Sequence, residues 1–165
     1  MFEKFGEFDS YEEINRAAAA QLEEGDTEAI YAIAEENGID REDAEEFIDG
    51  DAAELVTSLM AANGKLKVEA EELRPKEIMA DWLDYIRIQC FEDMDMRLAV
   101  RKKGKSLKKC IAKLVNWSLE HAEDVDKDIV QAAGLPVWAQ GRCKLGIPGM
   151  GTAKQLIKEY YLGDE

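Results

Sequence analysis

Apolar residues in the first sixty positions recur every three or four residues, and short polar turns separate them. This spacing is that of amphipathic helices, which bury one stripe of side chains. Ser10 and Glu13 form an S-x-x-E capping box for a first helix, and Gly25 supplies a residue that ends it. The pattern predicts four helices: Asp9 or Ser10 to Gly25, Asp26 to Asn37-Gly38, Asp40 to Asp49, and Ala52 to Ala62, the last ending at Asn63-Gly64.

A polar stretch over residues 65–74 interrupts this pattern, and Pro75 follows it directly. Proline ends helices, so the stretch is typical of a linker. A brief strand over residues 65–68 is the alternative, which leaves a minor short β-hairpin open. The linker would divide the chain into an acidic helical module, residues 1–64, and a carboxy-terminal helical module, residues 75–165.

Helical spacing returns after Pro75. Residues 78–90 spread apolar side chains over a wide face, which predicts a largely buried central helix. From Ser106, a second helix places Leu107, Cys110, Ile111, Leu114, Val115 and Leu119 on one side and lysines on the other. A short helix is predicted over 126–133, then a loop over 134–151 anchored by Trp138, then a last helix capped by Thr152 and Gln155. The predicted fold class is therefore all-α, a compact multi-helix protein.

Charge is distributed very unevenly along the chain. The 165 residues are 46% apolar and 35% charged, which suits a folded helical protein, and the net charge is −15. Residues 1–60 hold 19 acids against 3 bases, whereas residues 97–165 hold 8 acids against 13 bases. Such an uneven distribution of charge indicates which partners the protein can bind, and it does not indicate the fold.

The sequence carries no sign of secretion or of a membrane partner. Its start lacks the basic and apolar regions of a signal peptide, and no segment is long and apolar enough to span a bilayer. We therefore expect a cytoplasmic protein. Cys90, Cys110 and Cys143 form no CxxC pair, and Cys90 and Cys110 lie on apolar helix faces, so we expect reduced cysteines in the core.

Three segments resemble catalytic or metal-binding motifs but lack residues that those motifs require. The segment GIPGMGTAK lacks the P-loop lysine, because Thr152 follows Gly151 directly. The segment DREDAEEFIDGD has Ala44 where a calcium loop needs a ligand. His121 is the one histidine, and Ser118 precedes it without a patterned acid. The sequence therefore predicts a binding protein that is not an enzyme and has no cofactor and no metal site.

Two charged segments are candidate binding surfaces. Residues 97–113 contain eight cations and no acid, so they either neutralise phosphates or dock against the acidic helices. The acidic block is either solubilising surface or an imitation of a phosphate backbone that occupies the basic groove of a nucleic-acid-binding protein.

Residues 97–115 (RLAVRKKGKSLKKCIAKLV) and 157–165 (IKEYYLGDE) resemble the PcfK-like proteins of phages, plasmids and conjugative elements. That family pairs an A-x-x-x-x-x-K-S-[LI]-x-x-C helix with a late helix that ends in Tyr-Tyr and acids. The matching residues are Lys105, Ser106, Leu107 and Cys110 in the first motif and Tyr160, Tyr161, Asp164 and Glu165 in the second. Residues 120–150 form a longer insertion, Glu159 stands where family members have histidine, and the first ninety residues lie outside the match.

Some proteins related to this family are type II-A anti-CRISPRs, so the resemblance implies a phage or plasmid protein that inhibits Cas9 in a bacterial host. Acidic-surface DNA mimicry would then place the partner, Cas9 or its guide complex, against Glu12, Glu13, Glu23, Glu24, Glu35, Glu36, Asp43, Glu45 and Glu46. The alternative is a nucleic-acid-binding accessory of element transfer or replication that acts through Arg101, Lys102, Lys103, Lys105, Lys108 and Lys109. A homodimer stays open under both.

Overall fold

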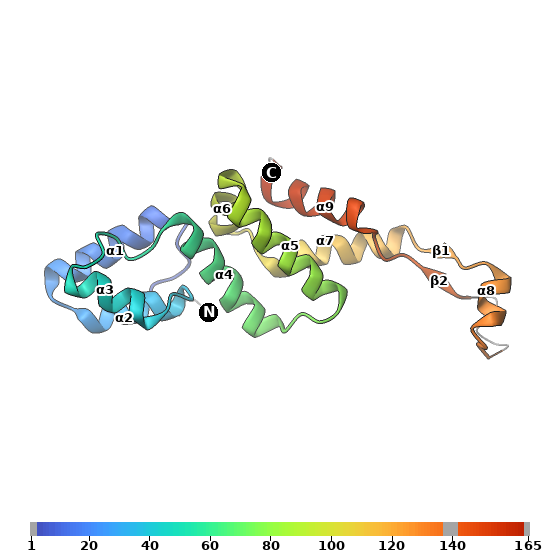
Figure 1. Cartoon of the computed structure of the whole chain (residues 1–165), viewed down its shortest axis with the longest axis horizontal. Coiled ribbons are helices and arrows are strands. Elements are labelled where there is room, and N and C mark those ends of the chain that lie inside the picture. Colours follow the sequence, from blue (N-terminus) through green and yellow to red (C-terminus); the bar gives the residue numbers. More distant parts are fainter. Residues whose placement is uncertain (1–2, 137–141, 164–165) are drawn as a thin grey trace.

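The computed structural model describes residues 3–136 and 142–163, and in these ranges the protein is all-α apart from one short ladder. The helices are α1 (Tyr11–Glu24), α2 (Thr27–Glu36), α3 (Arg41–Asp49), α4 (Ser58–Leu73), α5 (Ile78–Glu92), α6 (Met94–Arg101), α7 (Leu107–Glu120), α8 (Lys127–Ala132) and α9 (Met150–Leu162). The strands are β1 (Glu123–Asp124) and β2 (Lys144–Leu145). Figure 1 shows an elongated molecule with α1–α3 at one end and the ladder with α8 at the other.

Local capping signals set the ends of several helices as predicted. The Ser10 hydroxyl accepts a hydrogen bond from the Glu13 N–H at 3.3 Å, and Gly25 ends α1 in the left-handed conformation with φ 73°. The Asp26 carboxylate accepts from the Ala29 N–H at 3.0 Å and starts α2. At Ser106, where the helix was predicted to begin, the hydroxyl accepts from the Lys109 N–H at 3.2 Å, a cap that was not predicted.

The predicted capping box of the last helix is wrong. Helix α9 begins at Met150, with Gly149 as its N-cap residue, so Thr152 lies inside the helix and caps nothing. The first helical hydrogen bond runs from the Ala153 N–H to the Gly149 carbonyl at 2.9 Å. The helix starts earlier because the chain can turn helical as soon as it has passed Pro148. The expected anchor Trp138 lies outside the described residues.

Two hydrophobic cores are built on either side of α4. The first joins α1, α2, α3 and the start of α4, with Ile14, Ile30, Ile33, Phe47 and Leu55 at its centre. The second joins the rest of α4 to α5, α6, α7 and α9, around Leu66, Trp82, Ile86, Met96, Leu114 and Ile157. Neighbouring residues of α4 serve the two cores, because Ala61 belongs to the first and Ala62 to the second. Cys90 and Cys110 are free thiols in the second core, which confirms the prediction for them.

The predicted linker over 65–74 is wrong, and so is the alternative strand over 65–68. Residues 65–73 are the second half of α4, which runs unbroken through Asn63-Gly64. Gly64 does not end the helix. It lies where the Asn37-Gly38 backbone contacts α4, and a Cβ at Gly64 would lie 2.1 Å from the Asn37 carbonyl oxygen. Gly38 mirrors it, since its own Cβ would lie 2.2 Å from the Gly64 carbonyl oxygen. A continuous helix therefore connects the two predicted modules, with no flexible segment between them.

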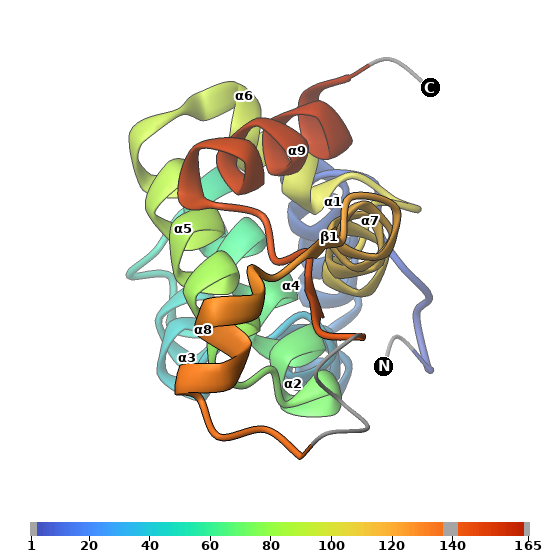
Figure 2. The ribbon, with the colours of Figure 1, turned by 90° about the vertical axis from the view of Figure 1, so that its right-hand side faces the viewer.

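The insertion after α7 forms an arm that projects from the helical body. Strands β1 and β2 pair antiparallel, with Glu123 opposite Leu145 and Asp124 opposite Lys144, and α8 lies beyond them (Figure 1). Figure 2 looks along the molecule from this end, with the arm in front of the bundle of α5, α7 and α9. The base of the arm is tight, because a Cβ at Gly146 would lie 1.9 Å from the Ser118 carbonyl oxygen. We name residues 121–136 and 142–149 the arm.

Candidate protein-binding surface and the polar seam beneath it

Most of the acids expected to face a partner lie exposed on α1–α3. Exposed carboxylates are those of Glu12, Glu23, Glu24, Glu35, Glu45 and Glu46. Glu28, Glu42, Asp49, Asp51 and Glu54 are also exposed in this part of the chain and were not among the predicted residues. Because α1, α2 and α3 share one core, all these carboxylates are held on one folded unit at one end of the molecule (Figure 1). We name this unit, residues 11–54, the acidic module.

Two of the predicted acids, Glu13 and Glu36, have structural partners instead, and the exposed Glu45 forms a surface ion pair. The Glu36 carboxylate accepts hydrogen bonds from the backbone N–H groups of Lys4 and Phe5, the latter at 3.1 Å. The Glu13 carboxylate accepts from the Asp9 N–H at 2.7 Å. Glu45 pairs with Arg41 at 3.0 Å, an exposed i, i+4 pair. Glu36 and Glu13 therefore hold the amino-terminal segment, residues 3–10, against the helices.

The basic segment is divided between surface and interior. Lys102, Lys103, Lys108 and Lys109 are exposed, whereas Arg101 is 1% exposed and Lys105 is 8% exposed. Long cationic side chains with buried stems are common, but a buried guanidinium needs acceptors. Two of the six residues predicted to bind nucleic acid therefore have a structural place instead.

Arg101 and Lys105 bind other segments of the chain. The Arg101 guanidinium donates to the Phe8 carbonyl at 3.1 Å and to the Asn37 side-chain oxygen at 3.0 Å. The Lys105 ammonium donates to the Tyr160 carbonyl at 2.9 Å, near the end of α9. Burial lowers the pKa of Arg101 to about 10, although nearby carboxylates led by Glu7 oppose this shift.

A buried lysine in α4 connects the amino-terminal segment to the loop after α6. The Lys65 ammonium donates to the Glu7 carboxylate at 2.6 Å, to the Lys102 carbonyl at 2.9 Å and to the Lys105 carbonyl at 2.7 Å. These three bonds use all three donors of an ammonium group. Burial lowers the pKa of Lys65, and the Glu7 carboxylate partly offsets this effect. We name Glu7, Lys65, Glu69 and Arg101 the polar seam.

The basic segment docks on residues 3–10, which precede α1, rather than on the acidic helices as the alternative expected, and the contacts are mainly through backbone groups. The Lys103 N–H donates to the Asp9 carboxylate at 2.9 Å, and the Gly104 N–H donates to the Glu7 carboxylate at 3.4 Å. Both acids belong to the amino-terminal segment rather than to the acidic module. The exposed carboxylates of the acidic module and the exposed lysines of the basic segment therefore do not cancel one another by these contacts.

Glu69 is the second buried charge of α4, one turn after Lys65. Its carboxylate accepts from the Leu107 N–H at 2.9 Å, one of the free N–H groups in the first turn of α7. Burial raises the pKa of Glu69, and this effect outweighs the hydrogen bond from Leu107 and the charge of Lys65. Sequence analysis missed this residue because Lys65 and Glu69 look like solvent-facing charges of a linker.

We expect Glu69→Gln to change how stability depends on pH. The pKa of Glu69 is higher in the folded than in the unfolded protein. The contribution of Glu69 to stability is therefore fully present below about pH 4.5, and it is lost as the pH rises through the folded pKa. The amide keeps an acceptor for Leu107 and cannot ionise. The variant should therefore gain stability relative to the wild type as pH rises from 4 to 8, measured by urea unfolding. A difference that stays constant over this range would contradict the raised pKa.

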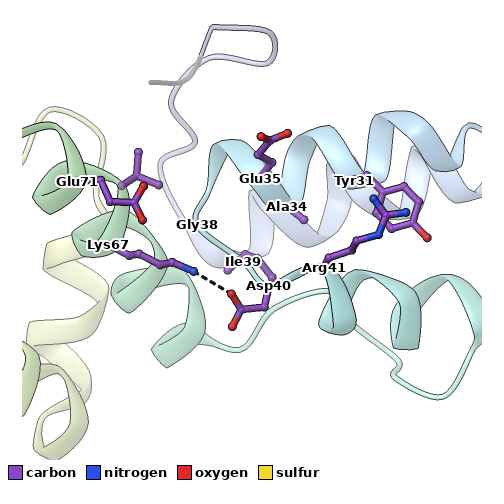
Figure 3. A pocket seen from close by; sticks show the side chains of 10 residues that line it. Tyr31, Ala34, Glu35, Gly38, Ile39, Asp40, Arg41, Lys67 and Glu71 are labelled. Atoms are coloured by element: carbon purple, nitrogen blue, oxygen red, sulfur yellow. Dashed lines mark hydrogen bonds and ion pairs between the residues drawn. The ribbon is translucent and has the colours of Figure 1, made fainter.

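A shallow concavity of about 430 Å³ lies between α2, the start of α3 and α4 (Figure 3). Lys67 reaches across it to Asp40 at 2.8 Å, and Arg41 lies over the Tyr31 ring at 4.2 Å. Asp40 therefore binds Lys67 rather than capping α3. Figure 3 shows the carboxylates of Glu35 and Glu71 at its edge, on opposite walls. Its charged groups are mostly paired, and it has no nucleophile beside a base.

The candidate catalytic residues do not form a site. The His121 ring stacks on Trp117 with centroids 4.2 Å apart, and the Ser118 hydroxyl donates to the Leu114 carbonyl at 2.9 Å. Burial raises the pKa of Cys90 and of Cys110 to about 12, which makes both thiols unreactive. Within residues 3–136 and 142–163, no three His, Cys, Asp or Glu side chains gather as metal ligands would.

Within the same residues, no helix is long and apolar enough to cross a membrane. No protein-family model, no curated protein and no solved structure matches the chain. The arguments for a function therefore rest on the acidic module, the basic segment and the contacts between them.

Proposed function

We propose that the protein is a non-catalytic inhibitor that presents the carboxylates of its acidic module to the basic nucleic-acid-binding groove of a host nuclease. The observation that carries the proposal is the exposure of many carboxylates on one rigid folded unit, with few cations paired to them. Carboxylates on folded helices keep their spacing, as phosphates do on a duplex. A dense array of one sign steers an oppositely charged partner and displaces its bound ions on contact.

The resemblance of residues 97–115 and 157–165 to the PcfK-like proteins makes Cas9 the first nuclease to test. A guided nuclease holds nucleic acid in a positively charged channel, which is the kind of surface that an acidic module fits. The nucleic-acid-binding alternative is weaker, because Arg101 and Lys105 bind Phe8, Asn37 and Tyr160 rather than facing outward.

Reversing four exposed acids should strongly weaken inhibition. Glu23, Glu24, Glu35 and Glu46 have exposed side chains near the carboxyl ends of α1, α2 and α3, where lysine suits the helix dipole. The variant with all four changed to Lys should therefore fold. We expect its inhibitory potency to fall by about two orders of magnitude, since steering by complementary charge is worth up to about 10³ in association rate. The assay is a titration into a Cas9–guide cleavage reaction.

A matched variant controls for net charge. Changing Glu72, Asp84, Glu92 and Glu120 to Lys makes the same change of charge on exposed residues outside the acidic module. The proposal expects this control to keep most of the inhibition. Equal loss in both variants would mean that overall charge, and not the acidic module, determines the effect.

Gel shifts of the wild-type protein with DNA and with RNA separate the two functions. Loss of cleavage without a shift supports direct inhibition of the nuclease. A shift with undiminished cleavage would contradict inhibition and support nucleic-acid binding, and changing Lys102, Lys103, Lys108 and Lys109 to Ala should then remove the shift.

A further inference from the structure

The arm exposes apolar side chains that its own fold leaves uncovered. Leu119 at its base is 74% exposed, Leu145 and Ile147 are 64% and 62% exposed, and Ile129 on α8 is 62% exposed. Leu119 was predicted on the buried face of α7, but α7 runs past the core at this end. A ladder of two residue pairs is marginal on its own in water. Exposed apolar residues on a projecting element are typical of a surface that binds another molecule.

The end of α8 near β1 is acidic as well as apolar. Glu123, Asp124, Asp126 and Asp128 precede Ile129, and all four carboxylates are exposed. Asp126 caps α8 by accepting from the Asp128 N–H at 2.8 Å, and Asp124 lies 3.8 Å from Lys144. Within residues 3–136 and 142–163, neither Glu123 nor Asp128 forms an ion pair. The arm thus offers an apolar anchor, Ile129, beside free negative charge.

The helical body has an apolar pocket with positively charged residues around it, opposite in charge to the tip of the arm. It has a volume of about 230 Å³ and lies between the α4–α5 turn and the first half of α7. Leu73, Met79 and Ile111 supply apolar walls, while Arg74, Lys76 and Lys108 supply positive charge. The nearest acids in sequence, Glu72 and Glu77, do not line it. We name it the turn pocket.

The backbone around the turn pocket is held in an unfavourable conformation. Arg74 has φ 48° and Glu77 has φ 53°, and these are the two described non-glycine residues with positive φ. Each such residue costs of order 1–3 kcal/mol and persists where the surrounding structure enforces it. The two residues flank Pro75 and Lys76, so the strained turn sets the rim of the pocket.

We propose that the turn pocket of one copy of the protein binds the acidic, apolar tip of the arm of a second copy, with Ile129 as the anchor. The carboxylates at Glu123 and Asp128 would face Lys76 and Lys108, which is charge complementarity of the kind that sets register between partners. In Figure 1 the arm extends outward beyond the end of the body where the α4–α5 turn lies, and no residue of the arm lines the turn pocket of its own chain, so the proposed contact is between copies. Mutual exchange of arms would make a closed two-fold dimer.

Charge exchange tests the contact on the full-length protein. One variant carries Lys76→Glu and Lys108→Glu, and the other carries Glu123→Lys and Asp128→Lys. Each alone places like charges across both contacts of the dimer. Mixed in equal amounts, they restore complementarity at both, because one contact is native and the other is reversed. Sedimentation velocity over a range of concentrations should show the wild type and the mixture as dimers, and each variant alone should dissociate at least tenfold more readily.

Further variants separate this contact from a general effect of charge. Ile129→Asp should dissociate the dimer, whereas Lys103→Glu with Lys158→Glu, on exposed residues that do not line the turn pocket, should leave it intact. Circular dichroism checks that each variant is folded. A wild type that is monomeric at every concentration would overturn the proposal, and so would a dimer that persists in both charge variants. Dimerisation is measured independently of nuclease inhibition, so one proposal can be wrong while the other holds.

Discussion

Lys65→Ala should lower the free energy of unfolding by about 3–5 kcal/mol, the usual effect of removing one partner from a buried ion pair. The side chain is fully buried, and its three hydrogen bonds hold Glu7 and two carbonyls of the loop after α6. Removing the ammonium leaves the Glu69 carboxylate without its nearby positive charge and takes one hydrogen bond from each of three acceptor groups. Urea unfolding followed by circular dichroism measures the change.

Lys67→Ala is the matched control for Lys65→Ala. Lys67 lies in the same helix and also forms an ion pair, with Asp40 at 2.8 Å, but its side chain is 48% exposed. Exposed pairs contribute about 0.2–1 kcal/mol, so the control should change stability by no more than this. Equal small effects for the two lysines would show that the polar seam does not connect the amino-terminal segment to the second core.

Gly38→Ala and Gly64→Ala should each destabilise the protein by about 3 kcal/mol or more, because backbone atoms must move apart to admit a methyl group. The added Cβ would lie 2.2 Å from the Gly64 carbonyl oxygen in the first variant and 2.1 Å from the Asn37 carbonyl oxygen in the second. Both oxygens belong to the main chain and cannot rotate away. This contact fixes the acidic module against α4. Thermal and urea unfolding measure the loss.

Gly50→Ala separates backbone conformation from crowding. Gly50 has φ 83° and Gly38 has φ 68°, so alanine meets similar left-handed strain at both, about 1–2 kcal/mol. Nothing lies within 4 Å of a Cβ at Gly50. Gly38→Ala should therefore cost about 2 kcal/mol more than Gly50→Ala. Similar costs at the two glycines would contradict the close contact between α4 and the turn that follows α2.

Features that depend on neighbours in the sequence were predictable. The caps at Ser10, Asp26 and Ser106 each use a side chain and an N–H group within three residues, so the pattern contains both partners. The apolar faces of α5 and of the first half of α7 were predicted for the same reason. The all-α class follows from these local signals, and the structure confirms it.

Features that depend on distant partners were not predictable. Asn63-Gly64 has the composition of a turn, and only the approach of Asn37 shows that glycine is needed there inside a helix. Lys65 and Glu69 look solvated until Glu7 and the α7 amino terminus are brought to them. The same holds for Arg101, whose acceptors at Phe8 and Asn37 lie far away in the sequence. One run of lysines and arginines therefore contains both surface and interior residues.

The continuous α4 changes how the acidic module would act. A module on a flexible linker would sample many orientations, and it would lose that freedom on binding. Here the Gly38–Gly64 contact and the polar seam hold it against the second core, so under the proposed function its carboxylates would reach a partner in one arrangement. Variants that loosen this join, such as Lys65→Ala, would weaken binding as well as stability if the partner needs that arrangement.

The most direct test is a binding competition between the protein and labelled target DNA for guide-loaded Cas9 at near-physiological salt. If the acidic module occupies the DNA-binding groove, the apparent Kd for DNA should rise in proportion to the concentration of wild-type protein. The variant with Glu23, Glu24, Glu35 and Glu46 changed to Lys should leave that Kd unchanged. A DNA affinity that stays constant at saturating wild-type protein would contradict the account, whether or not cleavage is blocked.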